Sequence, residues 1–396
     1  MAENRRSMPP RPPLPQNVRA LGLVSLLNDA SSEMIFPLLP TFVTRTLGAA
    51  PLALGVIDGA AEAVSAAMKI VAGRISDRAA QRKPLVLAGY ALAGLARPLI
   101  ALATGAGHVL GLRIVDRIGK GIRSGPRDAL IAEATPVEQR GRAFGFHRAM
   151  DHAGALVGPL LASAVLLVRH DLRLVFGLAA VPAALALLVL ATRVKETQPE
   201  PAALDPAAPA GPAEPMPRAL KLYLLVLGVF ALGNSSDTFL LLRAQDAGVS
   251  LAAVPLLWSL HHLVKSTLST PAGALSDRIG RKAAILIGWS VYALSYAGFA
   301  LASAAWHFWA LFAVYALFHA FAEGPERALM ADLGGGATRG RDFGWFHAVG
   351  GGMQLPASLL TGWLWQRFGP GVALGMGAAL AAMAALGLVA LIPRRA

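Results

Sequence analysis

The sequence predicts an all-α membrane protein with twelve transmembrane helices in two related bundles of six. Composition, the spacing of long apolar segments and an internal repeat support this prediction. The residue types A, V, I, L, M, F, W, Y and C fill 55% of the 396 positions, and charged residues fill only 15%. Soluble proteins carry about a quarter charged residues. At about 20 residues per crossing, a dozen helices use up the chain and leave little for a water-soluble domain.

The apolar segments form two sets, separated by a stretch rich in proline and alanine that cannot bury a core. We expect a basic, proline-rich cytosolic tail at 1–17, a first bundle at 18–192, a cytosolic linker at 193–218 and a second bundle at 219–396. No cleaved signal peptide is expected in the tail, because it lacks an apolar region of its own. The expected crossings lie near 18–43, 51–73, 84–104, 107–131, 143–167, 173–192, 219–242, 250–274, 283–303, 306–331, 343–365 and 371–392.

Lysine and arginine predict the orientation. With a cytosolic N-terminus, most basic residues between crossings fall on the cytosolic side. The other side then holds only Arg45, Arg169, Arg173, Arg243 and Arg367. Because positive charge is retained on the cytosolic side, we expect an inner (plasma) membrane protein with both termini in the cytosol. The net charge of +13 lies in short segments between apolar runs, so nucleic acid is not an expected partner. The absence of cysteine excludes disulfides and thiolate metal sites.

The two halves repeat at a spacing of about two hundred residues. The matching segments are Gly73–Arg78 with Gly273–Arg278, Gly125–Leu130 with Gly324–Leu329, Arg140–Gly145 with Arg339–Gly344, and Ser31–Glu33 with Ser235–Asp237. Four matches in register indicate a duplicated bundle. Two duplicated halves facing each other across a central path suit a carrier that works by alternating access.

Three motifs carry a family resemblance. Residues 273–282 read Gly-x-x-x-Asp-Arg-x-Gly-Arg-Lys, Arg117-x-x-Lys120-Gly121 lies in the fourth crossing, and Gly154-x-x-x-Gly158-Pro159 lies in the fifth. On these motifs the chain resembles the major facilitator superfamily over essentially its whole length, and the last motif resembles that of proton-coupled antiporters. The first-half copy adds a residue and lacks the second glycine, and Lys120 stands where glutamine is usual. The resemblance implies a secondary transporter.

The repeated loop motifs supply candidates for gating. Their charges can pair across the interface between the halves in one conformation only, which would set the balance between outward and inward states. The alternative is that these charges only orient the protein in the membrane. The gating candidates are Gly73, Asp77, Arg78, Asp128, Gly273, Asp277 and Arg278.

Ionisable residues at membrane depth are costly and are therefore candidates for function. Unpaired carboxylates in a low-dielectric cavity can exchange protons near neutral pH. The candidates for proton coupling are Asp29, Glu33, Asp58, Glu62, Asp237 and Glu323. The candidates for substrate binding are Asn28, Arg97, Arg113, Arg117, Lys120, Asn234, His261 and Lys265.

In the first half the buried cations roughly balance the acids, which predicts a neutral network opened by one proton or one substrate charge. The cations are Lys69, Arg97, Arg113, Arg117 and Lys120, and the acids are Asp29, Glu33, Asp58, Glu62 and Asp116. An alternative leaves Asp58 and Arg123 simply solvated at opposite ends of their helices. In the second half, His261 with Lys265 and His319 with Glu323 are i, i+4 pairs that either carry protons or only pack.

The leading functional hypothesis is a proton-coupled exporter of a small anionic or zwitterionic organic molecule. The expected partners are that molecule, protons and the lipid bilayer, with no cofactor or metal, and a monomer is expected. No HExxH, P-loop or GxSxG pattern occurs, so an enzyme is not expected. The alternatives are a proton symporter that imports an organic acid or sugar acid, a multidrug exporter of lipophilic cations and a non-transporting membrane receptor.

Overall fold

The computed structural model describes residues 13–78, 81–136, 139–196, 215–334 and 339–392. The regular elements within these ranges are all helical. The first half contains α1 (Gln16–Ile35), α2 (Leu39–Thr41), α3 (Pro51–Arg78), α4 (Lys83–Leu99), α5 (Ala106–Glu133), α6 (Arg140–Val168), α7 (Leu172–Leu178) and α8 (Ala180–Arg193). The second half contains α9 (Arg218–Gly233), α10 (Thr238–Asp246), α11 (Val254–Ile279), α12 (Arg281–Leu301), α13 (Ala305–Leu333), α14 (Arg339–Gly352), α15 (Gln354–Phe368) and α16 (Pro370–Leu391).

These helices form the twelve expected crossings, because several crossings consist of two or more consecutive pieces. The first crossing continues from α1 through a 3₁₀ turn at Phe36–Leu38, then α2, and then a π turn at Phe42–Thr46. Pro37 and Pro40 lack a backbone N–H and interrupt the regular ladder there. The seventh crossing, expected as one helix, is unwound between α9 and α10 over residues 234–237. Irregular backbone at membrane depth is tolerated where it lines a cavity.

Eight segments of the described chain are long and apolar enough to cross a membrane by length and composition alone. The remaining crossings are the first, formed by α1 and its continuation, the fourth (α5), the eighth (α11) and the eleventh (α14 with α15). All four carry buried polar side chains, including Asn28 in α1, Asp116 in α5, His261 in α11 and Ser358 in α15. The least apolar helices therefore hold much of the polar interior.

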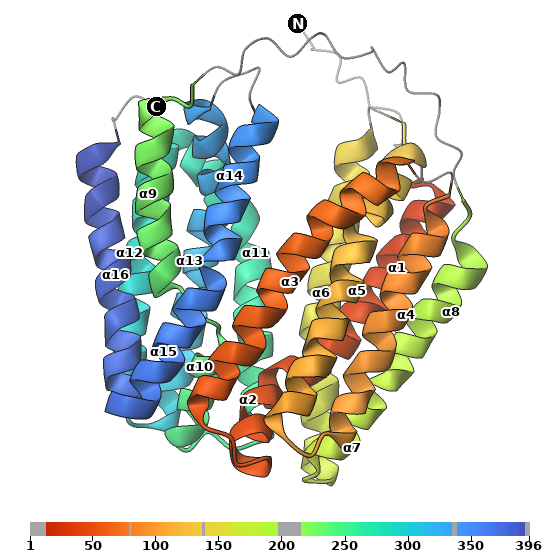
Figure 1. The fold of residues 1–396 in the computed structure, drawn as a ribbon, viewed down its shortest axis with the longest axis horizontal. Coiled ribbons are helices and arrows are strands. Elements are labelled where there is room, and N and C mark those ends of the chain that lie inside the picture. Colours follow the sequence, from red (N-terminus) through yellow and green to blue (C-terminus); the bar gives the residue numbers. More distant parts are fainter. Residues whose placement is uncertain (1–12, 79–80, 137–138, 197–214, 335–338, 393–396) are drawn as a thin grey trace, which may run out of the picture.

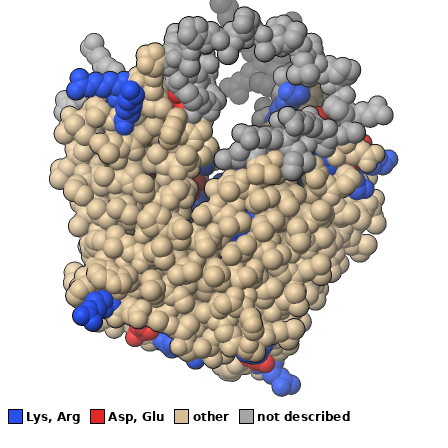
Figure 2. Space-filling view, in the orientation of Figure 1, with Lys and Arg blue, Asp and Glu red and all other residues tan. Residues whose placement is uncertain are grey.

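The two halves are separate bundles, with α1–α8 on one side of the molecule and α9–α16 on the other (Figure 1). The beginning of α1 and the end of α16 lie at the same end of the molecule, called here the termini side. Figure 2 shows a groove that enters between the halves from the termini side, with charged atoms visible in its depth.

The halves contact each other toward the end remote from the termini. The Thr41 hydroxyl of α2 donates to the Gln245 side chain of α10. Next to this bond, Arg45 Nη2 lies 3.1 Å from Asp246 Oδ1. Gly55 allows α3 to approach α15 closely, since a Cβ at this position would lie 2.2 Å from the Ser358 carbonyl oxygen. The structure is therefore closed at the remote end and open on the termini side.

Candidate functional site

A polar cavity of about 220 Å³ lies between the two halves. The first half contributes charged side chains from α3 and α5, and the second half contributes the unwound segment and polar groups of α13 and α15. The cavity is lined by Phe36, Asp58, Glu62, Arg113, Arg117, Asn234, Ser235, Ser236, Asp237, Tyr315, His319, Gln354 and Ser358. The two walls thus differ in chemistry.

Asp116 is the centre of the first-half wall. Its side chain is 1% exposed and lies against three arginines. Arg97 Nε donates to Asp116 Oδ1 over 2.8 Å. The Nη1 atoms of Arg113 and Arg117 each lie 3.5 Å from Asp116 Oδ2. One buried carboxylate therefore compensates parts of three buried cations, as burial of charge requires.

Two further carboxylates complete the charge balance. Arg113 Nη2 donates to Asp58 Oδ1 over 3.3 Å, and Arg117 Nε lies 3.0 Å from Glu62 Oε1. Three arginines, counting Arg97, therefore meet three carboxylates, counting Asp116. This confirms the predicted neutral network for six of its ten expected members.

Asp58 also joins the two halves. Its Oδ2 accepts from the hydroxyls of Ser236 and Thr238 in the second half, each over 2.8 Å. Its side chain is 6% exposed, so the alternative of a merely solvated Asp58 is wrong. The same holds for Arg123, which is buried with its guanidinium carbon 4.4 Å from the centre of the Tyr90 ring.

The network extends to α1 through Asn28. Arg97 Nη1 donates to the Asn28 carbonyl oxygen and to Asn28 Oδ1, each over 2.9 Å. Asn28 Nδ2 in turn donates to Asp29 Oδ1 over 2.8 Å. Asn28 and Arg97, both predicted to bind substrate, thus contact each other and do not line the cavity described above.

Glu33 makes a different kind of contact. Glu33 Oε2 accepts from the indole Nε1 of Trp258 over 2.8 Å, across the boundary between the halves. The Trp258 ring also stacks on His261, with 5.1 Å between ring centres. Within the described residues, no cationic side chain lies within ion-pair distance of Glu33. Its hydrogen-bond partner is therefore neutral.

Asp237, in the second-half wall of the cavity, also has a neutral hydrogen-bond partner. Its Oδ1 accepts from the Tyr315 hydroxyl over 2.7 Å. Asp237 forms no ion pair with any residue that the structure describes. Of the described carboxylates that line the cavity, Asp58 and Glu62 each form an ion pair with an arginine, and Asp237 does not.

The remaining second-half candidates form a short chain of contacts. Lys265 Nζ lies 2.6 Å from Glu323 Oε1, and His319 Nδ1 lies 3.0 Å from the same oxygen. The predicted pairing of His319 with Glu323 is confirmed. The predicted pairing of His261 with Lys265 is wrong, because His261 Nδ1 faces the Phe312 carbonyl oxygen at 3.4 Å and its ring packs against aromatic neighbours.

The cavity brings together some of the predicted residues and not others. Asp58, Glu62, Arg113, Arg117, Asn234 and Asp237 line it, whereas Asn28, Asp29, Glu33, Arg97, Lys120, His261, Lys265 and Glu323 do not. Sequence analysis missed Trp258, Tyr315, Gln354 and Ser358. Tyr315 could have been found, since it precedes His319 by four residues and therefore lies on the same helix face as His319 and Glu323.

The predicted gating contact is absent in this conformation. Asp128 accepts from Arg127 over 2.8 and 2.9 Å and does not pair with Arg278 here, so the role of these residues in gating stays a prediction. Asp277 and Arg278 are exposed, and a Cβ added to Gly273 would have no neighbour within 4 Å. The physical reason is the opening on the termini side, which keeps these ends of α5 and α11 apart. The surroundings of Gly73 and the side chains of Asp77 and Arg78 lie outside what the structure describes.

Comparison with known proteins identifies the family. The Major Facilitator Superfamily profile matches residues 21–354 and, in a second match, 222–396. An uncharacterised MFS-type transporter of Methanocaldococcus jannaschii is 36% identical over 360 residues, which are 89% of either chain. The multidrug resistance protein MdtH of Cronobacter sakazakii is 27% identical over 367 residues, covering 88% of this chain and 87% of MdtH.

Solved structures agree on the fold. A POT family transporter in complex with a thioalcohol-conjugated peptide has a TM-score of 0.78 at 12% identity, covering 94% of this chain and 97% of that one. A bacterial homologue of the lysosomal transporter Spinster, in an inward-facing and unoccupied conformation, has a TM-score of 0.71 at 18% identity, covering 94% and 91%. The chain is a multi-pass membrane transporter rather than an enzyme, and it belongs to the Major Facilitator Superfamily.

Proposed function

We propose that this transporter exports a small organic molecule carrying a positive charge, either a zwitterion or a cation, in exchange for protons. The observation that carries the proposal is the asymmetry of the cavity walls. The two arginines of α5 that line the cavity, Arg113 and Arg117, are each paired with a carboxylate, whereas Asp237 contacts only a neutral hydroxyl. A ligand ammonium group at Asp237 would gain an ion pair without breaking one.

This proposal departs from the anionic substrate expected from the basic stripe of α5. An anion would have to compete with Asp58 or Glu62 for Arg113 or Arg117, and separating a buried ion pair is costly. A cation at Asp237 meets no such competition. The similarity to MdtH, which is named a multidrug resistance protein, supports export of an organic compound.

Glu33 and Asp237 are the best supported proton-coupling groups. Both accept from neutral donors, so either one can gain or lose a proton without leaving a buried arginine unpaired. The Glu33 contact with Trp258 also joins the two halves. A change in its protonation would therefore alter a contact between the halves, and if that contact forms in one conformation only, this couples a proton to alternating access.

The open groove gives the side from which an exported molecule would enter. If both termini are cytosolic, as the distribution of basic residues predicts, the cavity is open to the cytosol in this structure. The contact of Asp58 with Ser236 and Thr238 would then help to close the opposite side. A single chain supplies the whole cavity, so the proposal requires only a monomer.

The first test is a ligand panel on the purified protein, using lipophilic cations, zwitterions and organic anions. A ligand that binds only the folded state raises the melting temperature. We expect cations or zwitterions to stabilise the wild type and to lose most of this effect in Asp237→Asn. The matched control is Asp246→Asn, which removes an exposed carboxylate remote from the cavity. Stabilisation by anions alone, unchanged in Asp237→Asn, would overturn the charge assignment.

Proton coupling is tested with a stabilising ligand in liposomes. Ligand movement should drive proton movement in the wild type, and both Glu33→Gln and Asp237→Asn should reduce that coupled flux at least about tenfold, within the range of a lost general acid–base group. Normal coupling in both variants would remove these residues from the proposal. Coupled movement of ligand and protons in the same direction would instead identify a symporter.

A further inference from the structure

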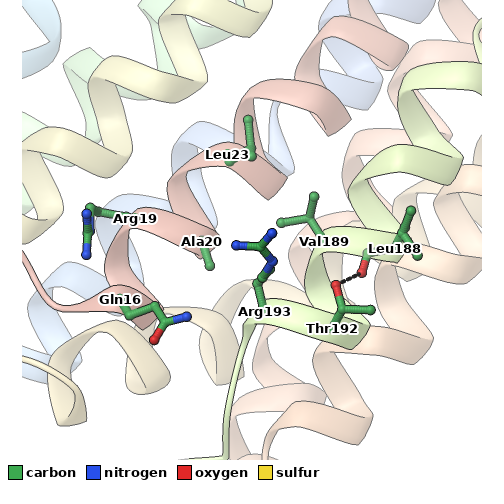
Figure 3. Close-up of a pocket in the computed structure, with 8 residues that line it drawn as sticks. All are labelled: Gln16, Arg19, Ala20, Leu23, Leu188, Val189, Thr192 and Arg193. Carbon is green, nitrogen blue, oxygen red and sulfur yellow. Dashed lines mark hydrogen bonds between the residues drawn. The ribbon is translucent and has the colours of Figure 1, made fainter.

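A second pocket lies outside the central cavity. It has a volume of about 500 Å³ and lies between the start of α1 and the end of α8, at the termini side of the first half (Figure 3). It shares no lining residue with the central cavity. Its lining consists of Gln16, Arg19, Ala20, Leu23, Leu188, Val189, Thr192 and Arg193.

The pocket carries unbalanced positive charge. Figure 3 shows the Arg193 side chain between Ala20 of α1 and Val189 of α8, and Arg19 directly precedes Ala20 in α1. Neither arginine forms an ion pair with a residue that the structure describes. The carboxylate that follows in the chain, Glu196, is occupied elsewhere, because it accepts from the backbone N–H groups of Arg82 and Lys83 over 2.9 Å each.

The two helix ends that carry these arginines are held together. Asn17 Nδ2 donates to the Lys195 carbonyl oxygen over 2.9 Å, and Asn17 Oδ1 accepts from the Lys195 backbone N–H over 3.0 Å. No side chain caps the N-terminus of α1 at Pro15. The free N–H groups of its first turn add partial positive charge at this end. The two helix ends that carry the positive charge of the pocket are therefore held together before any ligand binds.

The part of the pocket farther from the helix ends is apolar. Leu23 is 40% exposed and Leu188 is 58% exposed, although both face the pocket. The apolar surface continues along α8 through Leu185 and Val181, which are 45% and 56% exposed. These residues recur every three or four positions and therefore form one stripe on the helix. In a membrane this stripe faces the acyl chains while the arginines lie near the headgroups.

We propose that this pocket binds an anionic phospholipid from the leaflet on the termini side. Its phosphate would lie between Arg19 and Arg193, and one acyl chain would lie along Leu188, Leu185 and Val181. Basic pockets between transmembrane helices favour anionic headgroups in this way. The lipid would connect α1 with α8. This site is independent of the transported molecule and of proton coupling.

The test measures lipid binding to the purified full-length protein by native mass spectrometry. The probes are dioleoylphosphatidylglycerol, dioleoylphosphatidylcholine and inorganic phosphate. We expect one phosphatidylglycerol to bind more tightly than phosphatidylcholine. Each of Arg19→Gln and Arg193→Gln should weaken that binding about fivefold, which corresponds to about 1 kcal/mol per basic residue near an anionic headgroup. The double variant should approach the affinity for phosphatidylcholine.

The matched control is Arg218→Gln with Lys221→Gln, which removes two charges at the start of α9, in the corresponding place of the second half. This control should bind phosphatidylglycerol as the wild type does. All four substitutions lie at helix ends, and a circular dichroism melt would verify that the variants are folded. Equal weakening in the control would show diffuse attraction to basic residues and would overturn the site. Binding of inorganic phosphate as tight as that of phosphatidylglycerol would overturn the lipid assignment.

Discussion

The two halves share one architecture but present different chemistry to the cavity between them. The first half opposes Arg97, Arg113 and Arg117 with three carboxylates in a closed network centred on Asp116. In the second half, the ion pair of Lys265 with Glu323 lies beside an aromatic core. Its cavity carboxylate, Asp237, contacts a tyrosine hydroxyl.

This difference in charge pairing indicates that the two duplicated halves have different roles. A buried network with every charge compensated resists change, because removal of any member leaves another charge unpaired. A carboxylate with a neutral partner can change its charge with a smaller effect on its surroundings. The first half is therefore suited to hold a fixed geometry, and the second half is suited to respond to a ligand or a proton.

The largest effect that tests this difference between the halves is expected when one carboxylate is removed from each half. Asp116→Asn leaves three buried arginines short of a counter-charge and should lower the free energy of unfolding by about 3–5 kcal/mol. Glu323→Gln should cost about 1 kcal/mol or less, since the Glu323 side chain is 35% exposed and solvent screens its charge. Denaturant unfolding in detergent, at one fixed lipid content, measures both values.

Equal losses in the two variants would contradict the proposed difference between the halves. A combined Asp116→Asn and Arg97→Gln variant supplies the internal control. Because it removes one charge of each sign, it should recover part of the stability that Asp116→Asn loses. No recovery would mean that Asp116 stabilises the fold through something other than these ion pairs.

A smaller effect is expected from glycines that set the spacing of equivalent helix pairs. A Cβ at Gly89 in α4 would lie 2.6 Å from the Gly119 carbonyl oxygen and 2.7 Å from the Arg123 Cβ in α5. At the corresponding Gly288 in α12, the nearest atom would be the Ala322 Cβ at 3.1 Å. The arginine-bearing pair of helices is thus packed more closely than its counterpart.

Gly89→Ala should therefore destabilise the protein by about 1–3 kcal/mol through overpacking. Gly288→Ala should be close to neutral, because the small shift it requires is offset by up to about 1 kcal/mol from the higher helix propensity of alanine. The same unfolding assay compares the two substitutions directly. A larger loss in Gly288→Ala would mean that tight packing does not belong to the arginine-bearing half.

The number of crossings and the duplication could be predicted because hydrophobicity and repeated motifs are properties of the chain itself. The break at residues 234–237 was not predicted, although Asn234, Ser235, Ser236 and Asp237 interrupt the apolar pattern of 219–242, because the reason to unwind is a cavity made with another half. Asp58, Glu62 and Asp237 could be identified as candidates for proton coupling because they are ionisable residues expected inside the membrane. Their partners are on other helices, so sequence spacing could not assign them. Trp258 and Tyr315 were missed because aromatic residues are ordinary in membrane helices.

The smallest effect is expected where the halves meet at the end remote from the termini. The side chains of Arg45 and Asp246 are 52% and 37% exposed, so their 3.1 Å ion pair is screened by water and salt. The neighbouring bond between Thr41 and Gln245 is buried. If buried contacts hold this end closed, Arg45→Gln should shift the balance between the conformations by less than about 1 kcal/mol, or about fivefold.

The cysteine-free sequence allows this shift to be measured. Ser163 is buried between the halves and its hydroxyl donates to the Ala252 carbonyl oxygen over 2.7 Å. A Ser163→Cys thiol should therefore react with a maleimide only when this end opens. Arg45→Gln should raise the labelling rate at most about fivefold, and 1 M salt should produce a similar rise without that substitution. If the labelling rate rose well above tenfold and salt did not reproduce the rise, the ion pair of Arg45 with Asp246 would be a main contact that holds the two halves together at this end.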